Sequence, residues 1–152
     1  MKIFILSCGV FEPELNIILK EINDDKLFNE DIEVTYLPFG LHTNLDKLKY
    51  EITSNLDNIK SDKIILLYGS KCHYMFHEFL KDYPNLITFK YSNCIDLIVG
   101  DEKKYNNDKN LYITPGWVIK FDELNKFINA VDIYDIRQQY GRYENVIIGD
   151  TK

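Results

Sequence analysis

Three cysteines and one histidine follow four predicted strands of this 152-residue chain, and their side chains could do chemistry together. A deprotonated thiol is a nucleophile and a soft metal ligand, and imidazole is a common ligand of zinc and iron. The four residues are Cys8, His42, Cys72 and Cys94. They predict a tetrahedral zinc site or an iron centre, with a metal ion or a small molecule as partner. No Cys-x-x-Cys pair is present to make the spacing diagnostic.

Other interpretations of these residues remain open. Cys72 could be the nucleophile of a metal-free cysteine enzyme, with His42 or His73 as its base. Free cysteine is often buried, so the thiols could simply fill space, and His42 could be a hydrogen-bonded histidine at a strand end. His73 and His77 have the i, i+4 spacing of one helix face, but no carboxylate stands at a spacing that would make it the third ligand of a metal site. For that pair a solvated helix face is the favoured interpretation.

Trp117 is the only tryptophan and ends a Thr-Pro-Gly-Trp run just after a predicted strand. It could wall a cofactor pocket, to which Tyr68, Tyr91 and Tyr105 would add, and the protein would then be a non-catalytic binding module. A tryptophan beside a Pro-Gly turn more often plugs the core, and this interpretation is favoured. Glycine-rich nucleotide loops and the Gly-x-Ser-x-Gly elbow of hydrolases are missing from the sequence.

The elements that must position these residues follow from the hydrophobic pattern. Short apolar runs rich in β-branched and aromatic residues predict strands at 2–7, 32–37, 63–68, 86–90, 111–114 and 144–148. Residues Pro115 and Gly116 predict a turn, and Thr43 or Asn44 can cap the second helix. Five helical faces are expected: Leu15, Ile18, Leu19 and Ile22; Leu45, Leu48, Ile52 and Leu56; Met75, Phe76, Phe79 and Leu80; Ile95, Leu97 and Ile98; and Phe121, Leu124, Phe127, Ile128 and Val131, continuing to about Tyr140.

Alternating strands and helices predict one α/β domain over residues 1–152, with three layers and a mostly parallel, Rossmann-like sheet. The last strand fits an antiparallel edge position, and the strand order does not follow from the pattern. Ligands of such sheets bind at the carboxyl ends of the strands, where all four reactive residues would lie. Cys72 and Cys94 are also expected to start helices, whose positive ends favour thiolate.

Composition excludes several classes of partner. The formal net charge of −6 argues against nucleic-acid binding and against docking on anionic membranes. The apolar runs have the length of strands, far short of the roughly 20 residues that span a bilayer. An odd number of cysteines without an export signal predicts reduced thiols and a cytoplasmic protein. The oligomeric state cannot be read from the pattern.

An ordered set of short motifs resembles an uncharacterised prokaryotic family, the domain of unknown function 1638. The family pattern has Tyr-Gly-x-Cys, an Asp-Cys-Ile segment and Thr-Pro-Gly-Trp, which match positions Cys72, Cys94 and Trp117; Cys8 and His42 match as well. This chain departs from it at Asn93, where aspartate is usual, and at His73, where glycine is common. The motifs are Cys8-Gly-Val, Gly40-Leu-His42, Tyr68-Gly-Ser-Lys-Cys72, Asn93-Cys94-Ile-Asp-Leu-Ile-Val-Gly100, Tyr112-Ile-Thr-Pro-Gly-Trp117 and Tyr143 through Asp150.

The resemblance implies no settled activity. Members of the family look like companions of anaerobic corrinoid-dependent methyl transfer, which favours a soft metal or a corrinoid as the cofactor. The function expected from sequence is therefore a metal-binding protein, an accessory to corrinoid or methyl-group metabolism.

Overall fold

A four-stranded parallel sheet forms the centre of the protein, in the order β2-β1-β3-β4. The computed structural model describes residues 1–28, 30–100, 109–127 and 143–149, with residues 129, 132, 134, 138 and 141. β1 pairs in register with β2 from Lys2 opposite Asp31, and with β3 from Ile3 opposite Lys63. The strands are β1 (Lys2–Cys8), β2 (Asp31–Leu37), β3 (Lys63–Leu67) and β4 (Leu86–Ile87).

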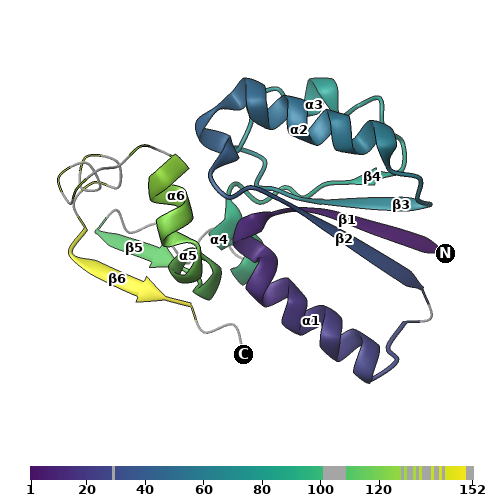
Figure 1. Ribbon diagram of the computed structural model, residues 1–152, viewed down its shortest axis with the longest axis horizontal. Helices are drawn as coiled ribbons and strands as arrows, with labels where there is room; N and C mark the ends of the chain where they lie inside the picture. The colour runs from purple at the N-terminus through teal and green to yellow at the C-terminus, as the bar shows by residue number, and fades with distance from the viewer. Residues whose placement is uncertain are drawn as a thin grey trace.

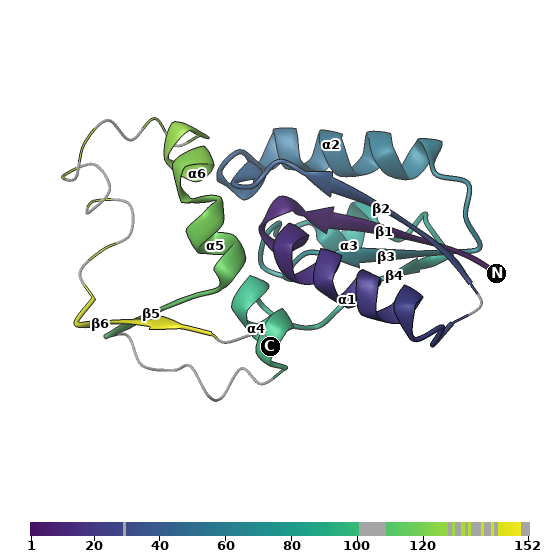
Figure 2. The same cartoon turned by 60° about the horizontal axis from the view of Figure 1, so that its bottom comes forward.

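Helices cover both faces of this sheet, which confirms the predicted mixed α/β architecture. In Figure 1, α2 and α3 lie on one face and α1 lies on the other. Figure 2 shows α4 and α5 beyond the carboxyl ends of the strands, at the end opposite the N-terminus. The helices are α1 (Glu12–Asp24), α2 (Leu45–Asn58), α3 (Phe76–Phe79), α4 (Cys94–Val99), α5 (Pro115–Ile119) and α6 (Phe121–Phe127), with 3-10 turns at Gly9–Phe11 and Leu41–Thr43.

Local sequence explains where several helices begin. Asn44 rather than Thr43 caps α2, because its side-chain oxygen accepts from the Lys47 amide at 3.0 Å. Thr43 instead donates to the Gly40 carbonyl. Asn93 caps α4 by accepting from the amides of the second and third helical residues. These caps satisfy amides that the helices themselves leave unpaired.

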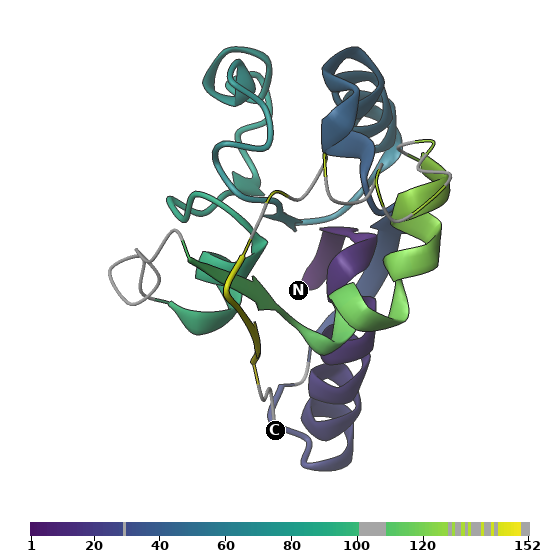
Figure 3. The same cartoon turned by 90° about the vertical axis from the view of Figure 1, so that its left-hand side faces the viewer.

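The last strand does not lie where the sequence predicted it. β6 (Asn145–Ile148) is not an antiparallel edge of the main sheet; it pairs in parallel with β5 (Asn110–Ile113) in a separate two-stranded sheet. Figure 3 shows this small sheet and α5 in front of the carboxyl end of the main sheet. Residues 128–140 of the long helix expected there lie largely outside the described residues, as do 101–108 of the expected loop.

The Pro115–Gly116 pair does not form a free turn; it starts α5. Thr114 caps this helix, and proline suits the first helical position because its missing amide would have no partner there. Gly116 is required by packing, since a Cβ at this position would lie 1.8 Å from the Val10 carbonyl oxygen. The Gly116 amide also donates to the Glu14 carboxylate at 2.9 Å. The Pro-Gly pair that predicted a turn therefore lies where α5 packs tightly against α1 and the Gly9–Phe11 turn.

The core lies mainly between the sheet and α2, whose predicted inner residues Leu48, Ile52 and Leu56 are buried. The predicted face of α1 is only partly covered: Leu15 is buried, whereas Ile18 is 49% exposed. Within the described part of the chain, no helix combines the length and apolar character needed to cross a membrane.

Candidate functional site

The four predicted reactive residues line one cavity of about 240 Å³ at the carboxyl edge of the sheet, the thiol pocket. Cys8 is the last residue of β1, and His42 lies in the 3-10 turn after β2. Cys72 lies in the turn after β3, and Cys94 is the first residue of α4, after β4. The remaining lining residues are Val10, Phe11, Phe39, Tyr68, Gly69, Lys71, Ser92, Asn93 and Trp117.

Two neighbouring loops bring Cys72 and Cys94 to the same pocket. The amides of Ser70 and Lys71 donate to the carbonyls of Tyr91 and Ser92 at 2.7 and 3.1 Å, so the segment after β3 is bonded to the segment after β4. The loops touch at Gly69, where a Cβ would lie only 2.5 Å from the Asn93 Cα. A glycine is therefore needed here for close approach, not for an unusual backbone angle.

The prediction that Cys72 starts a helix is wrong, whereas Cys94 does start α4. The Cys72 amide closes a turn onto the Gly69 carbonyl at 2.9 Å, and α3 begins only at Phe76. Apolar periodicity predicted the helix but could not set its first residue. A helix dipole therefore does not act on the Cys72 thiol.

Trp117 both packs on the core and walls the pocket. Its ring meets Phe39 edge to face, with ring centres 5.2 Å apart. Its indole Nε1–H donates to the Cys94 sulfur at 3.3 Å. Trp117 therefore fits both interpretations of the sequence, because it packs against the core and also forms part of the pocket wall.

Burial keeps the three thiols protonated in this arrangement. It raises the pKa of Cys8 to about 12 and that of Cys72 to about 11, and it also raises the pKa of Cys94. Negative charge on Cys94 adds to the rise at both other thiols, and charge on Cys72 adds to the rise at Cys8. The three sulfurs are therefore electrostatic neighbours, and positive charge beside them would be needed for all three to ionise near neutral pH.

Polar hydrogens around Cys8 partly oppose the effect of burial. Burial remains the larger cause of its raised pKa, but the Val10 amide and the Tyr68 hydroxyl both lower it by favouring the thiolate. The Tyr68 hydroxyl is buried and has no partner that meets full hydrogen-bond geometry, although it lies close enough to interact with Cys8. An unpaired buried hydroxyl is costly, and a thiolate beside it would be a strong acceptor.

The other two thiols have donors as well. Against the larger effect of burial, the Gly69 backbone lowers the pKa of Cys72. The Trp117 indole lowers the pKa of Cys94, followed by the amides of Cys94 itself and Ile95. Each sulfur thus faces at least one N–H or O–H group, an arrangement that stabilises metal-bound thiolates in proteins.

His42 lines the same cavity as the three sulfurs. Its pKa is lowered by burial, which favours the neutral imidazole that binds metals. Among the residues that the structure describes, no three His, Cys, Asp or Glu side chains already stand at metal-binding spacing. Metal binding would require the thiols to turn toward a common point.

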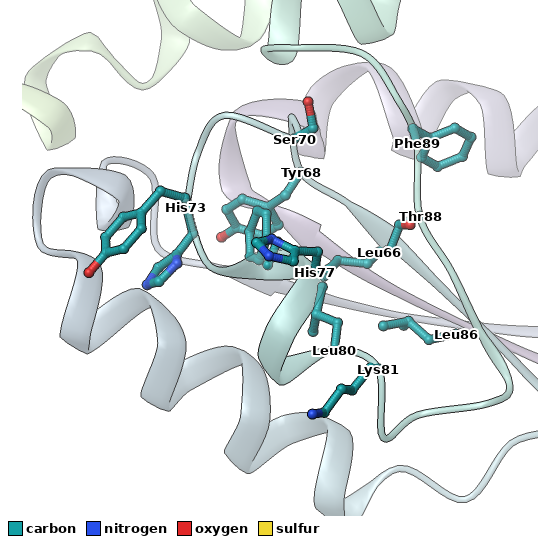
Figure 4. A pocket seen from close by; sticks show the side chains of 12 residues that line it. Leu66, Tyr68, Ser70, His73, His77, Leu80, Lys81, Leu86, Thr88 and Phe89 are labelled. Atoms are coloured by element: carbon teal, nitrogen blue, oxygen red, sulfur yellow. The ribbon is translucent and has the colours of Figure 1, made fainter.

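His73 and His77 have different surroundings. His73 is buried, stacks on Tyr74 and accepts the Met75 amide through Nδ1 at 3.0 Å, so it is a structural histidine rather than part of a solvated helix face. His77 is exposed beside Glu78. Both line a different cavity of about 440 Å³, which Figure 4 shows; Tyr68 lines both this cavity and the thiol pocket.

Sequence reasoning missed Lys71 and Phe39 as pocket residues. Lys71 adjoins Cys72 in the chain, which could have suggested it. Phe39 follows Pro38 after β2 and is 1% exposed, and it meets Trp117 through the packing of α5, which no local pattern indicates.

Comparison with known proteins gives one match. The family described as "Protein of unknown function (DUF1638)" matches residues 36–152. This range includes every candidate site residue except Cys8. No curated protein and no solved structure matches the chain.

Proposed function

The chain belongs to the DUF1638 family, whose function is unknown, and we propose that it is a metal-binding protein. The region that matches the family includes His42, Cys72 and Cys94. Zinc or iron would be held by the thiolates of Cys8, Cys72 and Cys94, with His42 as the fourth ligand. The single observation behind this proposal is that these four side chains, far apart in sequence, line one small cavity. Soft sulfur and imidazole donors suit zinc and iron, not magnesium or calcium.

The environment of the sulfurs supports a metal in preference to a free nucleophile. Burial raises the pKa of Cys72 to about 11, so an unliganded Cys72 would be almost entirely the unreactive thiol at neutral pH. A bound cation would supply the missing positive charge, and the N–H and O–H donors would then face thiolates. The metal-free cysteine enzyme therefore remains the weaker alternative.

The size of the pocket favours a metal ion with a small ligand. Its volume of about 240 Å³ lies below the roughly 300 Å³ at which pockets for drug-sized ligands begin. A whole corrinoid would not fit in this pocket and could present only an edge to it. In corrinoid or methyl-group metabolism the protein would therefore act as an accessory. We place the protein in the cytoplasm, because all three cysteines are free.

Titration with Co²⁺ under anaerobic conditions tests the proposal, because tetrahedral cobalt–thiolate sites have intense and distinctive absorption. We expect saturation near one equivalent, with bands of thiolate ligation. Cys72→Ser should weaken binding by about tenfold or more, at least as much as the loss of a group that hydrogen-bonds to a metal ligand. His77→Ala is the matched control, because this exposed imidazole lies outside the thiol pocket and should change nothing. Absence of thiolate bands in the native protein would refute the site.

A further inference from the structure

A groove of about 580 Å³ lies between α1 and α4, on the face of the sheet that α1 covers only in part. Figures 1 and 2 both show α4 beside the first turns of α1. Two apolar side chains of this α1–α4 groove, Ile18 and Val99, are 49% and 39% exposed. Its volume falls within the roughly 300–1,000 Å³ of small-molecule sites. The residues that matter below are Phe11, Glu14, Ile18, Phe89, Tyr91 and Val99.

Glu14 is the one charged residue among the described residues that line the α1–α4 groove. It is 7% exposed, and its Oε1 accepts from the Gly116 amide at 2.9 Å. Its Oε2 is buried without a hydrogen-bond partner, and no ion pair of Glu14 is observed in the part of the chain that the structure describes. A buried carboxylate without a cation is costly, so it favours a cation that enters the groove.

Aromatic rings are a second feature of the groove that favours a cation. Phe11 comes three residues before Glu14 at the start of α1, and Phe89 and Tyr91 come from the segment after β4. The face of an aromatic ring attracts a cation within about 6 Å of its centre. The net charge of −6 adds a weaker attraction for cations over the whole surface.

We propose that the α1–α4 groove binds a small amine with an apolar body, with its ammonium group at the Glu14 end and its body against the apolar walls. The ammonium group does not have to touch Oε2, because opposite charges a few ångströms apart attract strongly where little water lies between them. The inference is independent of the proposed metal site, since no cysteine or histidine is among the described residues that line this groove.

Three probes share one apolar body and differ in the head group: phenylbutylamine is a cation, phenylbutanol is neutral and phenylbutyrate is an anion. Each is titrated into the native protein at neutral pH by isothermal calorimetry. We expect the amine to bind about tenfold or more tightly than the alcohol, and the anion to bind more weakly than the alcohol. Trp117 emission is a second readout, because Trp117 follows Gly116, whose amide is bonded to Glu14.

Glu14→Gln tests the head group. Glutamine keeps an oxygen that can accept from the Gly116 amide but removes the negative charge. Amine affinity should therefore fall about tenfold, to that of the alcohol, while alcohol affinity changes by less than about twofold. Glu12→Gln is the matched control, because Glu12 pairs with Lys120 and does not line the groove, and it should leave all three affinities nearly unchanged.

Ile18→Ala tests the apolar body. It shortens an exposed part of the wall without opening the core, since Ile18 is 49% exposed. Both the amine and the alcohol should bind about three- to fivefold more weakly, because they lose the same apolar contact.

Several outcomes would overturn this assignment. They are no binding of any probe, equal binding of the amine and the alcohol to the native protein, and an amine affinity that a folded Glu14→Gln variant or Ile18→Ala leaves unchanged. If Glu14→Gln does not fold, the comparison of the three probes on the native protein decides. A lysine blocked at both ends that binds as tightly as phenylbutylamine would assign the groove to a lysine side chain of a protein partner, and would overturn the small-molecule assignment.

Discussion

At the scale of single residues, the thiols are defined by two opposing effects. Burial raises the pKa values of Cys8 and Cys72 to about 12 and 11, whereas nearby N–H and O–H groups lower them. Such a site disfavours a free thiolate nucleophile, because the thiols keep their protons at neutral pH. It suits a metal cation, which would take the place of the thiol protons on binding. The indole of Trp117 and the hydroxyl of Tyr68 are therefore part of the chemistry of the pocket, not only of its packing.

Alkylation against pH tests this balance directly. In metal-free protein, iodoacetamide should modify Cys72 slowly at neutral pH, with a reactivity midpoint near pH 11, because burial disfavours the thiolate. Peptide mass spectrometry after timed labelling measures the rate at each pH, and the unfolded chain in denaturant provides the control with a midpoint near ~8.5. A folded-state midpoint at or below the unfolded one would instead support the metal-free cysteine enzyme.

At the scale of elements, the sequence predicted each described strand and most helices because their apolar patterns are local. It also placed the four reactive residues after successive strands, and parallel pairing then put them at one edge. Strand order and the position of β6 depend on contacts between distant segments, which no local pattern encodes. The same holds for the bond between Glu14 and Gly116, which are 102 residues apart.

The close packing of α5 against the Gly9–Phe11 turn gives a prediction at this scale. Gly116→Ala would place a methyl group 1.8 Å from the Val10 carbonyl oxygen, so α5 must shift, at a cost of about 1–3 kcal/mol. Because Trp117 is the next residue, its fluorescence should change and its bond to Cys94 should be lost. Chemical denaturation and emission spectra measure the two effects.

Gly149→Ala is the control for that substitution, because its Cβ would meet the nearest atom, the Ile113 carbonyl oxygen, at an ordinary 3.8 Å. It should be close to neutral in both measurements. If Gly116→Ala were equally silent, α5 would not be fixed by this contact, and Trp117 would lack the support described above.

At the scale of the whole molecule, the candidate ligands come from the carboxyl ends of all four strands of the main sheet. Cys8 ends β1, and His42, Cys72 and Cys94 lie in the segments that follow β2, β3 and β4. A metal held by all four would cross-link the sheet at its carboxyl edge. Binding to the folded state alone stabilises it by about 2.7 kcal/mol when the free metal is at 100 times its dissociation constant. For a chain of this length that corresponds to a rise in Tm of roughly 5–11 °C.

Calorimetry without Zn²⁺ and with free Zn²⁺ at about 100 times its dissociation constant checks this expectation, and Cys72→Ser should lose most of the increase. His77→Ala should keep it. An equal effect of Zn²⁺ on the native protein and on Cys72→Ser would mean that zinc binds elsewhere.

The raised thiol pKa values also predict how stability depends on pH. A thiol whose folded pKa exceeds its unfolded value of ~8.5 contributes stability below that pH, and this contribution is lost as pH rises through the folded pKa. Metal-free protein should therefore lose stability from about pH 8.5 toward pH 11–12, the folded values of Cys72 and Cys8. Bound zinc should protect against the loss, because its thiolates are already formed. Denaturation midpoints across this range, in both forms, measure the difference.

The metal content of protein purified anaerobically without added metal tests the account most directly. Elemental analysis should find close to one equivalent of zinc or iron in the native protein and much less in Cys72→Ser. Less than about a tenth of an equivalent of any transition metal in the native protein would contradict the account, because a site of buried sulfur and imidazole ligands should retain its metal.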